Sequence, residues 1–172
     1  CKWHKVTNEG VDVRVRELLD RILENQSDEG WFMEYEGADP GYQSLCTSYL
    51  ADVHRMRPDF DLLEPLRKSV RFLWHFAHPD GSFGGIYGSR NTRFYFPAGI
   101  ECLAHEIPEA AALATHMRRS IQDECVVTLT TMDEPNLIPM FNSYCLSASR
   151  SVKYAKPPSL PCHETTPLRR HW

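Results

Sequence analysis

The amino-acid sequence predicts an all-α protein built from repeated pairs of helices. Two observations support this prediction: glycine-rich segments recur about 50 residues apart, and the segments between them carry apolar residues at helical spacing. A third observation is that no segment alternates apolar and polar residues for long enough to indicate a sheet. Repeats of this length are typical of units that cannot bury their apolar faces alone and therefore stack on one another.

The repeat is clearest in the two glycine-rich segments themselves. Gly30 aligns with Gly81 and Phe32 aligns with Phe83, in both cases 51 positions apart. The helices that follow are offset by 53 positions, so the second copy carries a small insertion. A glycine-rich turn allows the chain to leave one helix and to place an aromatic ring over the end of the helical pair.

Six helices are expected, and the first three follow from apolar spacing and from residues that begin or end helices. Residues 11–25 have apolar side chains at steps of three and four, with charged side chains on the opposite face. A second helix is expected over 42–56, because the same spacing continues there and a proline follows. Asp61 and Glu64 then stand three apart before an apolar run, which is typical of a helix N-terminus. They predict a third helix that carries Leu66 through Phe76.

The other three helices are expected at residues 94–106, 108–122 and 136–150, with Pro108 dividing the first two. Between the last two, residues 126–130 are mostly β-branched, and both a short strand and an extended loop are open there. Short connections alternate with long, glycine-rich ones. Helical hairpins of this kind stack into an α-solenoid or close into a ring of inner and outer helices.

Composition and charge limit the classes of partner. The chain has 172 residues, of which 42% are hydrophobic and 24% are charged, as is ordinary for a globular protein. Its net charge of −4 gives no basic footprint for nucleic acid, so we expect no nucleic-acid partner. No run approaches about 18 consecutive apolar residues, so we expect no membrane span. These features leave the oligomeric state open.

The cysteines are spaced widely and irregularly. Cys46, Cys102 and Cys145 lie within expected helices beside apolar residues, which predicts buried free thiols. A disulfide framework would suit a shorter, loop-rich secreted chain, so we expect a reducing compartment and a cytoplasmic location. Cys102 and His105 are one helical turn apart, but no Cys-x-x-Cys accompanies them. We therefore expect neither a metal nor another cofactor.

We expect residues 1–155 to form a single domain and residues 156–172 to form an irregular tail rich in proline and basic residues. The length suffices for one domain with a real core. The chain begins at Cys1 rather than at a methionine, and we interpret it as a piece of a longer protein.

The glycine-rich segments also carry a family resemblance. Asp80–Gly85 is followed by Asn91–Tyr95 and then by a helix of small residues, a pattern that resembles the repeat of the prenyltransferase β subunit. The segment from Gln26 to Trp31 is similar to the repeat of squalene and other terpenoid cyclases. Both families share an (α/α) toroid, a fold that also carries polysaccharide lyases and unsaturated-glucuronyl hydrolases. The resemblance spans roughly residues 11–106, and more loosely residues 126–150, and implies helical hairpin repeats that form part of an (α/α) toroid.

The chemical residues of the isoprenoid enzymes are missing from the matching positions. Protein prenyltransferases hold zinc with an Asp, a Cys and a His, but the repeat position of the Asp is Asn91 here and no Asp-x-Cys pair follows. Terpenoid cyclases protonate an alkene with an Asp-x-Asp-Asp acid, whereas Asp59–Asp61 lacks the final Asp. We interpret these two carboxylates as capping residues. The resemblance therefore predicts the scaffold, and the function has to be argued from a site.

The candidate site consists of polar residues in the two long connections, because connections on one rim of a ring point at a common mouth. Arginine can hold a carboxylate through two parallel hydrogen bonds, and tyrosine can stack on a sugar or transfer a proton. The first connection supplies Glu34, Tyr35 and Glu36 to this mouth. We expect substrate to be bound by Arg90, Arg93, Tyr42, Tyr87 and Trp31, and catalysis to involve Asn91, Tyr95, Asp39 and Glu101.

Two other interpretations of these residues are open. Arg90, Asn91 and Arg93 can instead tie the second connection to neighbouring helix ends. Paired carboxylates are also conceivable, since Glu34 or Asp39 opposite Glu101 would suit glycoside hydrolysis at a separation of about 5–9 Å.

The residues favour a carbohydrate-active domain that handles an acidic polysaccharide or oligosaccharide as a lyase or hydrolase, with a polar small molecule or saccharide as its ligand. One alternative is an isoprenoid enzyme related to the prenyltransferases and terpenoid cyclases, which requires an apolar cavity fed by Trp74, Phe76, Phe94 and Phe96. The other is a non-catalytic helical-repeat module that binds a partner protein. Whether the chain is an enzyme stays open.

Overall fold

The computed structural model describes residue 6, residues 10–151 and residues 159–160. This part of the chain is helical, and its β-structure is limited to three isolated bridges. Its elements are α2 (Asp12–Glu24), α3 (Pro40–Met56), the 3₁₀ helix η1 (Pro58–Phe60), α4 (Leu63–Trp74), α5 (Ala98–Leu103), α6 (Pro108–Gln122) and α7 (Glu134–Arg150). The prediction of an all-α protein is confirmed for these residues, whereas most of the expected tail lies outside them.

Two boundaries differ from the sequence-based expectation. The helix expected at 94–106 is shorter, since α5 has only six residues and Pro97 is its N-cap. The chain before Pro97 is held outside the helix, because the N–H of Phe96 donates to Ser44 Oγ at 3.0 Å. Residues 126–130 form a loop, so the loop alternative holds there and the strand does not.

The start of α4 also differs. Asp61 does not cap this helix: it has a left-handed backbone with φ of 48°, and Leu62 is the N-cap without a side-chain hydrogen bond. Asp59 forms no cap either, because its carboxylate accepts two hydrogen bonds from Arg57, each 2.8 Å long. The interpretation of these two carboxylates as caps of α4 is therefore wrong, and Asp61 instead stands at the C-cap of η1, where its backbone N–H donates to the carbonyl of Pro58.

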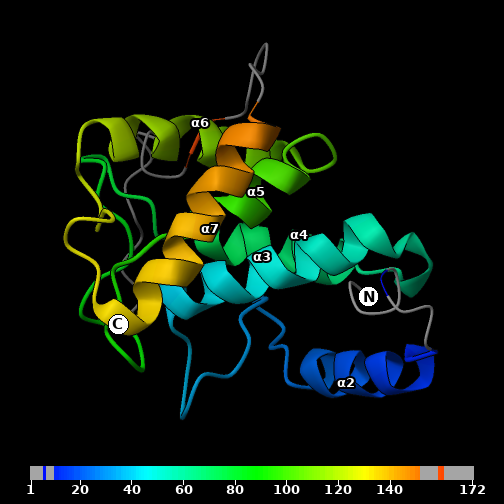
Figure 1. Cartoon of the computed structure of the whole chain (residues 1–172). Coiled ribbons are helices and arrows are strands. Elements are labelled where there is room, and N and C mark those ends of the chain that lie inside the picture. The colour runs from blue at the N-terminus through cyan, green and yellow to red at the C-terminus, as the bar shows by residue number, and fades with distance from the viewer. Residues whose placement is uncertain (1–5, 7–9, 152–158, 161–172) are drawn as a thin grey trace.

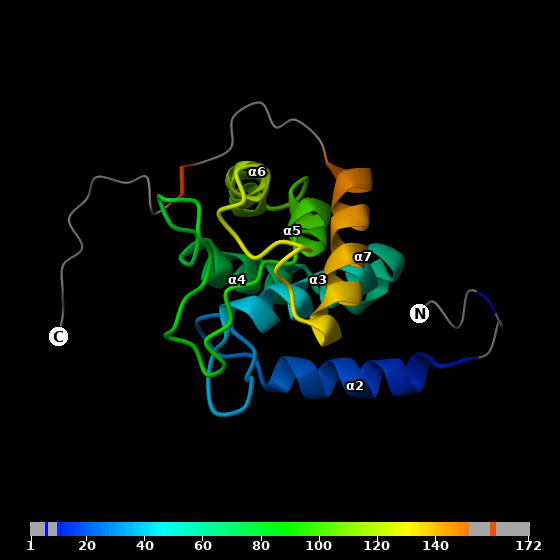
Figure 2. The same cartoon turned by 60° about the vertical axis from the view of Figure 1, so that its left-hand side comes forward.

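Helix α3 lies at the centre of the fold (Figures 1 and 2). It contacts both α4 and α5, α5 also contacts α6 and α7, and α4 contacts α6. Helices α3 and α5 come close together because Gly99 has no side chain: a Cβ there would lie 2.6 Å from Ser48 Cα. Buried apolar side chains fill the space between the helices, among them Leu66, Leu73, Ile100, Leu113 and Met117.

Serine side chains join α3, α5 and α7. Ser48 of α3 accepts a hydrogen bond from the N–H of Gly99 at 3.0 Å, and Ser143 of α7 accepts one from the N–H of Ala98 at 3.1 Å. The first turn of a helix leaves such N–H groups without an intrahelical partner. The neighbouring helices therefore supply the caps of α5 and fix its start between them.

The two glycine turns, residues 26–32 and 77–83, share one pattern of backbone hydrogen bonds. In each turn the second residue donates to the carbonyl of the sixth, at 2.8 and 3.0 Å, and the glycine donates back to the second residue at 3.0 Å. An antiparallel bridge joins the first and last residues of each turn. Gly30 and Gly81 have φ of 99° and 85°, a region that side chains disfavour. The likeness seen in the sequence thus extends to the local backbone.

The thiols of the described cysteines are free. Cys46 and Cys102 are half-buried, and burial raises the pKa of the Cys46 thiol to about 12. The prediction of a buried thiol is wrong for Cys145, because that residue of α7 is exposed. Cys1 and Cys162 lie outside the described residues.

In the part of the chain that the structure describes, no helix combines the length and the apolar character needed to cross a bilayer.

Candidate functional site

The first connection, residues 33–39, leads from the first glycine turn to α3, and the second connection, residues 84–97, leads from the second turn to α5. The two connections lie side by side (Figure 2). Asp39 joins them from the N-terminus of α3. One of its oxygens accepts from the N–H of Tyr42 at 3.1 Å and from the hydroxyl of Thr92, and the other accepts from the N–H groups of Arg90 and Thr92 at 3.1 and 3.2 Å. The side chain is buried. Asp39 therefore caps α3 and also anchors the second connection.

Ser89 makes the second link between the connections. Its N–H donates to the carbonyl of Ala38 at 2.8 Å, and its hydroxyl donates to the carbonyl of Glu34 at 2.7 Å. Glu34 itself pairs with Gly37 in a small bridge, and Tyr35 at the tip has a left-handed backbone with φ of 56°. The first connection is thus a tight hairpin that the second connection crosses.

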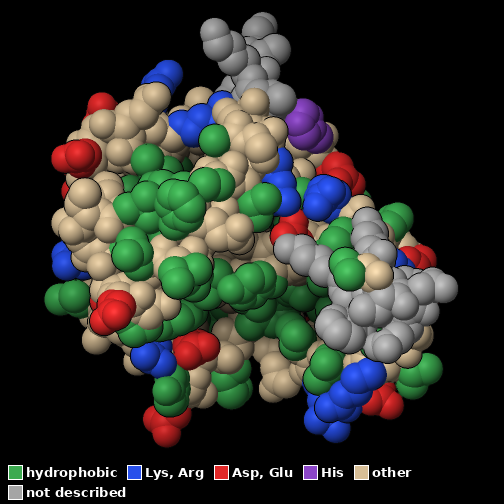
Figure 3. All heavy atoms as spheres, viewed as in Figure 1, with side chains coloured by type: hydrophobic (Ala, Val, Ile, Leu, Met, Phe, Trp, Pro, Cys, Tyr) green, Lys and Arg blue, Asp and Glu red, His purple; other side chains and the backbone are tan. Residues whose placement is uncertain are grey.

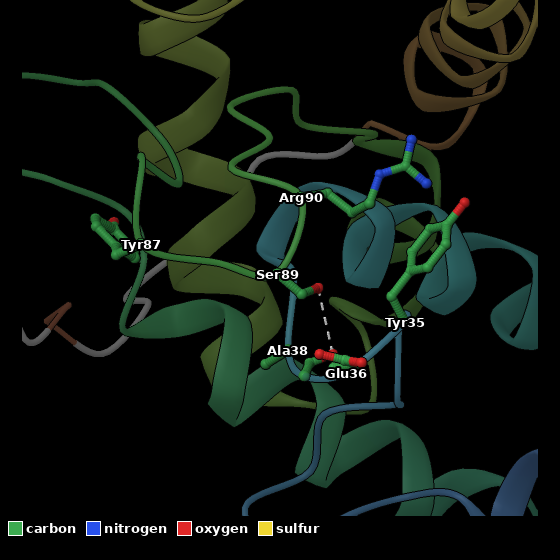
Figure 4. A pocket seen from close by; sticks show the side chains of 7 residues that line it. Tyr35, Glu36, Ala38, Tyr87, Ser89 and Arg90 are labelled. Atoms are coloured by element: carbon green, nitrogen blue, oxygen red, sulfur yellow. Dashed lines mark hydrogen bonds between the residues drawn. The ribbon is translucent and has the colours of Figure 1, made fainter.

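Arg90 lies beside two aromatic rings. Its guanidinium carbon is 4.7 Å from the centre of the Tyr35 ring and 5.1 Å from that of Tyr42. One guanidinium nitrogen is also 3.5 Å from a carboxylate oxygen of Glu34. Figure 4 shows the side chains of Arg90 and Tyr35 projecting to the same side of the second connection.

Tyr87 lies on the other side of that connection (Figure 4). Its hydroxyl donates to the carbonyl of Gly84 at 2.5 Å and lies 2.9 Å from Nε2 of His78. Its ring stacks on Phe76 with centroids 5.7 Å apart. Burial raises the pKa of the Tyr87 phenol above its ordinary value.

The two connections enclose an open pocket of about 750 Å³, which we call the connection pocket. Its lining combines two tyrosine rings, each with a phenol hydroxyl, with one carboxylate, one serine hydroxyl and one guanidinium. The residues are Tyr35, Glu36, Gly37, Ala38, Tyr87, Ser89 and Arg90. Such a mixture of flat apolar surface and a few hydrogen-bonding groups is typical of a site for a polar small molecule.

The structure brings only some of the expected site residues to this pocket. Arg90 and Tyr87 line it, while Tyr42 and Asp39 support it from behind through their contacts with the second connection. Arg93 is exposed and lines a different hollow, next to Cys125 and Thr131.

Trp31 and Asn91 have local contacts outside the pocket lining. The Trp31 indole N–H donates to Glu29 at 3.1 Å within the first turn. Asn91 is exposed and has φ of 55°, and its amide nitrogen, when oriented to donate, reaches the carbonyl of Gly88 at 2.9 Å.

Tyr95 and Glu101 lie in the interior rather than at the pocket. Tyr95 is 1% exposed, and its ring packs on Phe83 with centroids 5.0 Å apart. Glu101 is equally buried and accepts two hydrogen bonds from Arg118 of α6, at 2.6 and 2.5 Å. This bidentate pair links α5 to α6.

Sequence reasoning missed the residues that hold the two connections together. Ser89 and Thr92 belong to the second glycine-rich segment, but only the folded chain brings them to Ala38 and Asp39. Arg118, the partner of Glu101, was also missed, because a separation of 17 positions gives no local signal.

The described residues contain no cluster of three or more histidine, cysteine or carboxylate side chains that could hold a metal ion. Cys102, His105, His116 and Cys125 accordingly do not form such a cluster.

Apolar side chains gather on the face where α3 and α7 lie (Figure 3). Tyr49 of α3 and Phe141 of α7 are each 58% exposed, and Ile138 is 78% exposed. The hollow between these helices has a volume of only about 20 Å³, less than a small ligand needs. Of the aromatic residues expected in an apolar cavity, Phe96 is fully buried, whereas Phe76 follows α4 and lines a different pocket, beside Phe72.

No family model, no curated protein and no solved structure matches this chain. The functional argument therefore depends on the geometry of the molecule alone.

Proposed function

We propose that the connection pocket binds a saccharide. The observation that carries this proposal is the meeting of Tyr35, Ser89 and Arg90 from two separate connections around one open hollow. A sugar presents an apolar face that stacks on an aromatic ring and hydroxyl groups at its edge that exchange hydrogen bonds. Tyr35 supplies an exposed ring, and the surrounding side chains supply donors and acceptors.

The charges around the pocket favour a neutral saccharide over the acidic one that the sequence suggested. Arg90 is the cation of the lining, but Glu34 lies 3.5 Å from its guanidinium and Glu36 adds a further carboxylate to the pocket. A uronate would have to compete with Glu34 for Arg90 and would meet like charge from Glu36. A neutral sugar can use the same groups as hydrogen-bond partners without this cost.

The proposal concerns binding, and the contacts explain why catalysis receives less support. Of the residues expected to be catalytic, Asp39 and Glu101 already accept hydrogen bonds that hold elements of the fold together, and Tyr95 is buried. A lyase or hydrolase activity, like a cytoplasmic location, remains a prediction from the sequence.

We also propose that the helices form part of an (α/α) toroid. The order of contacts supports this, because α3, α5 and α7 touch in succession while α4 and α6 touch each other beside them. In a ring of helical hairpins, alternate helices form an inner and an outer layer in this way. The long connections then open on one rim, where the connection pocket lies.

An isoprenoid enzyme is less well supported. An isoprenoid substrate has a long apolar chain and requires an enclosed apolar cavity, whereas the apolar face of α3 and α7 offers only a hollow of about 20 Å³.

Calorimetry with cellohexaose, maltohexaose and hexagalacturonate tests the proposal. We expect a neutral hexasaccharide to bind, and Tyr35→Ala or Arg90→Ala to weaken its affinity about tenfold. Tyr49→Ala is a matched control, since Tyr49 is similarly exposed but lies on another face. Absence of binding by all three glycans, or equal weakening by Tyr49→Ala, would overturn the proposal; tighter binding of hexagalacturonate would overturn the preference for a neutral sugar.

A further inference from the structure

A second pocket, of about 390 Å³, lies where the end of α4 meets the first glycine turn, and we call it the α4 pocket. Phe72 and Phe76 form its apolar wall, one helical turn apart and with ring centroids 4.6 Å apart. Glu29, Arg71 and His75 complete its lining with groups that donate and accept hydrogen bonds. The α4 pocket thus combines aromatic and polar groups in the same way as the connection pocket.

Neighbouring contacts hold the polar groups of the α4 pocket in place. The carboxylate of Glu29 accepts from the Trp31 indole at 3.1 Å. The guanidinium of Arg71 donates to Glu109 of α6 at 3.1 Å. Both side chains are therefore positioned before a ligand arrives, which lowers the entropy lost on binding.

One aromatic contact joins the linings of the two pockets, which have no residue in common. Tyr87 lines the connection pocket, and its ring stacks on Phe76 of the α4 pocket with centroids 5.7 Å and planes 29° apart. The rings of Phe72, Phe76 and Tyr87 consequently form a series that leads from one pocket to the other.

We infer that the two pockets form one elongated site for a linear oligosaccharide, with one end of the sugar chain on Tyr35 and the other in the α4 pocket. This inference rests on the proposed function and deepens it. A linear glycan has the required shape, because its successive rings present apolar faces along the chain and hydroxyl groups along its edges. Glu29, Arg71 and His75 then bind the distant end of the sugar chain.

The inference predicts that affinity depends on chain length. We expect calorimetry to show that cellohexaose or maltohexaose binds about tenfold more tightly than cellobiose or maltose. The double substitution Glu29→Gln and His75→Ala changes two exposed side chains, so its effect on folding is small. It should remove most of the advantage of the hexasaccharide and leave disaccharide affinity unchanged. Arg14→Ala on α2, an exposed residue outside both pockets, is the control.

The outcomes separate this inference from the proposed function. Equal affinity for disaccharide and hexasaccharide, or an unchanged hexasaccharide affinity in the double variant, overturns the elongated site while the connection pocket keeps its function. Absence of binding by every glycan overturns both. A loss of disaccharide affinity in the double variant also overturns the inference, since the α4 pocket would then not be the distant end.

Discussion

The two glycine turns share one backbone geometry, but different side chains hold them. In the first, Gln43 of α3 accepts from the N–H of Phe32 at 2.8 Å and donates to the carbonyl of Gly30 at 3.1 Å. In the second, Tyr95 packs its ring on Phe83. The first turn is thus held by the Gln43 amide of α3, whereas the second is held by aromatic packing and by His116 of α6, whose Nε2 lies 3.0 Å from the carbonyl oxygen of His78. What the turns have in common is the positive φ of a glycine, so the same backbone geometry is compatible with different side-chain partners.

The connections after the turns differ more than the turns do. The first is a tight hairpin over residues 34–37, closed by Asp39 at the start of α3. The second carries the insertion and crosses the first through Ser89 and Arg90. The turns therefore belong to the scaffold, whereas the unequal connections create the connection pocket.

Substituting the two glycines gives the largest contrast between the turns. Gly30→Ala adds a Cβ that collides with the backbone carbonyl of Lys68, whereas at Gly81 the Cβ would meet side-chain atoms of Cys125 at 3.0 and 3.1 Å. Both variants also force alanine into a disfavoured φ. We expect losses in the free energy of unfolding of about 3–5 kcal/mol for Gly30→Ala and about 1–3 kcal/mol for Gly81→Ala.

Urea unfolding followed by circular dichroism measures both losses. Gly37→Ala is a useful control, because its Cβ would have an ordinary contact with Ser89 at 3.7 Å. Equal losses at Gly30 and Gly81 would contradict the view that the first turn packs more closely on its neighbouring helix.

Asp39 and Asn91, one from each connection, offer a second contrast. Asp39→Ala removes the cap of α3 and leaves the buried N–H of Thr92 without its acceptor, so we expect a loss of about 2–4 kcal/mol. Asn91→Gly should stay within about 0.5 kcal/mol of the native protein, because glycine suits its φ of 55°. Thermal or urea unfolding of the two variants measures both losses of stability. A larger loss for Asn91→Gly than for Asp39→Ala would contradict the view that Asp39 anchors the second connection.

The smallest effect concerns Tyr87 of the second connection. Because burial raises its pKa in the folded protein, the folded state holds the phenol proton more tightly than the unfolded state does. The resulting stabilisation is complete below the ordinary pKa of about 10 and is lost as pH rises through the raised value. Tyr87 is 56% exposed, so solvent screening keeps the effect well under about 1 kcal/mol.

The measurement is the urea midpoint of unfolding of the native protein and of Tyr87→Phe, each at about pH 8 and at about pH 11. Between these two pH values, the urea midpoint should fall slightly less for Tyr87→Phe than for the native protein. An identical pH dependence in both proteins would show that the phenol is not held in this way.

Local sequence signals predicted the helices and the turns because both depend on neighbouring residues. Apolar spacing located α2, α3, α4, α6 and α7 to within a few residues, and Gly30 and Gly81 marked turns that require positive φ. The short α5 was harder to predict, since its beginning depends on Ser44, Ser48 and Ser143 from other helices. A cap supplied by a distant helix leaves no periodic trace in the chain.

The candidate site was predicted in part for the same reason. Polar residues in long connections identified Arg90 and Tyr87, which do line the connection pocket. Residue type alone did not separate them from Glu101, whose carboxylate binds Arg118 in the interior. Sequence analysis predicts whether a charged residue lies on a helix or in a loop, but the packing between helices determines which residue it forms an ion pair with.

By itself, the sequence determined that the chain is helical in its described part, where its turns fall and which turns share a backbone. These properties follow from side-chain spacing and from the freedom of glycine, both of which act over a few residues. Only the tertiary structure decided that the connection of the second turn crosses that of the first, and hence which side chains meet in a pocket. That outcome depends on contacts between residues about 50 positions apart, such as those of Asp39 with Arg90 and Thr92, which no local pattern encodes.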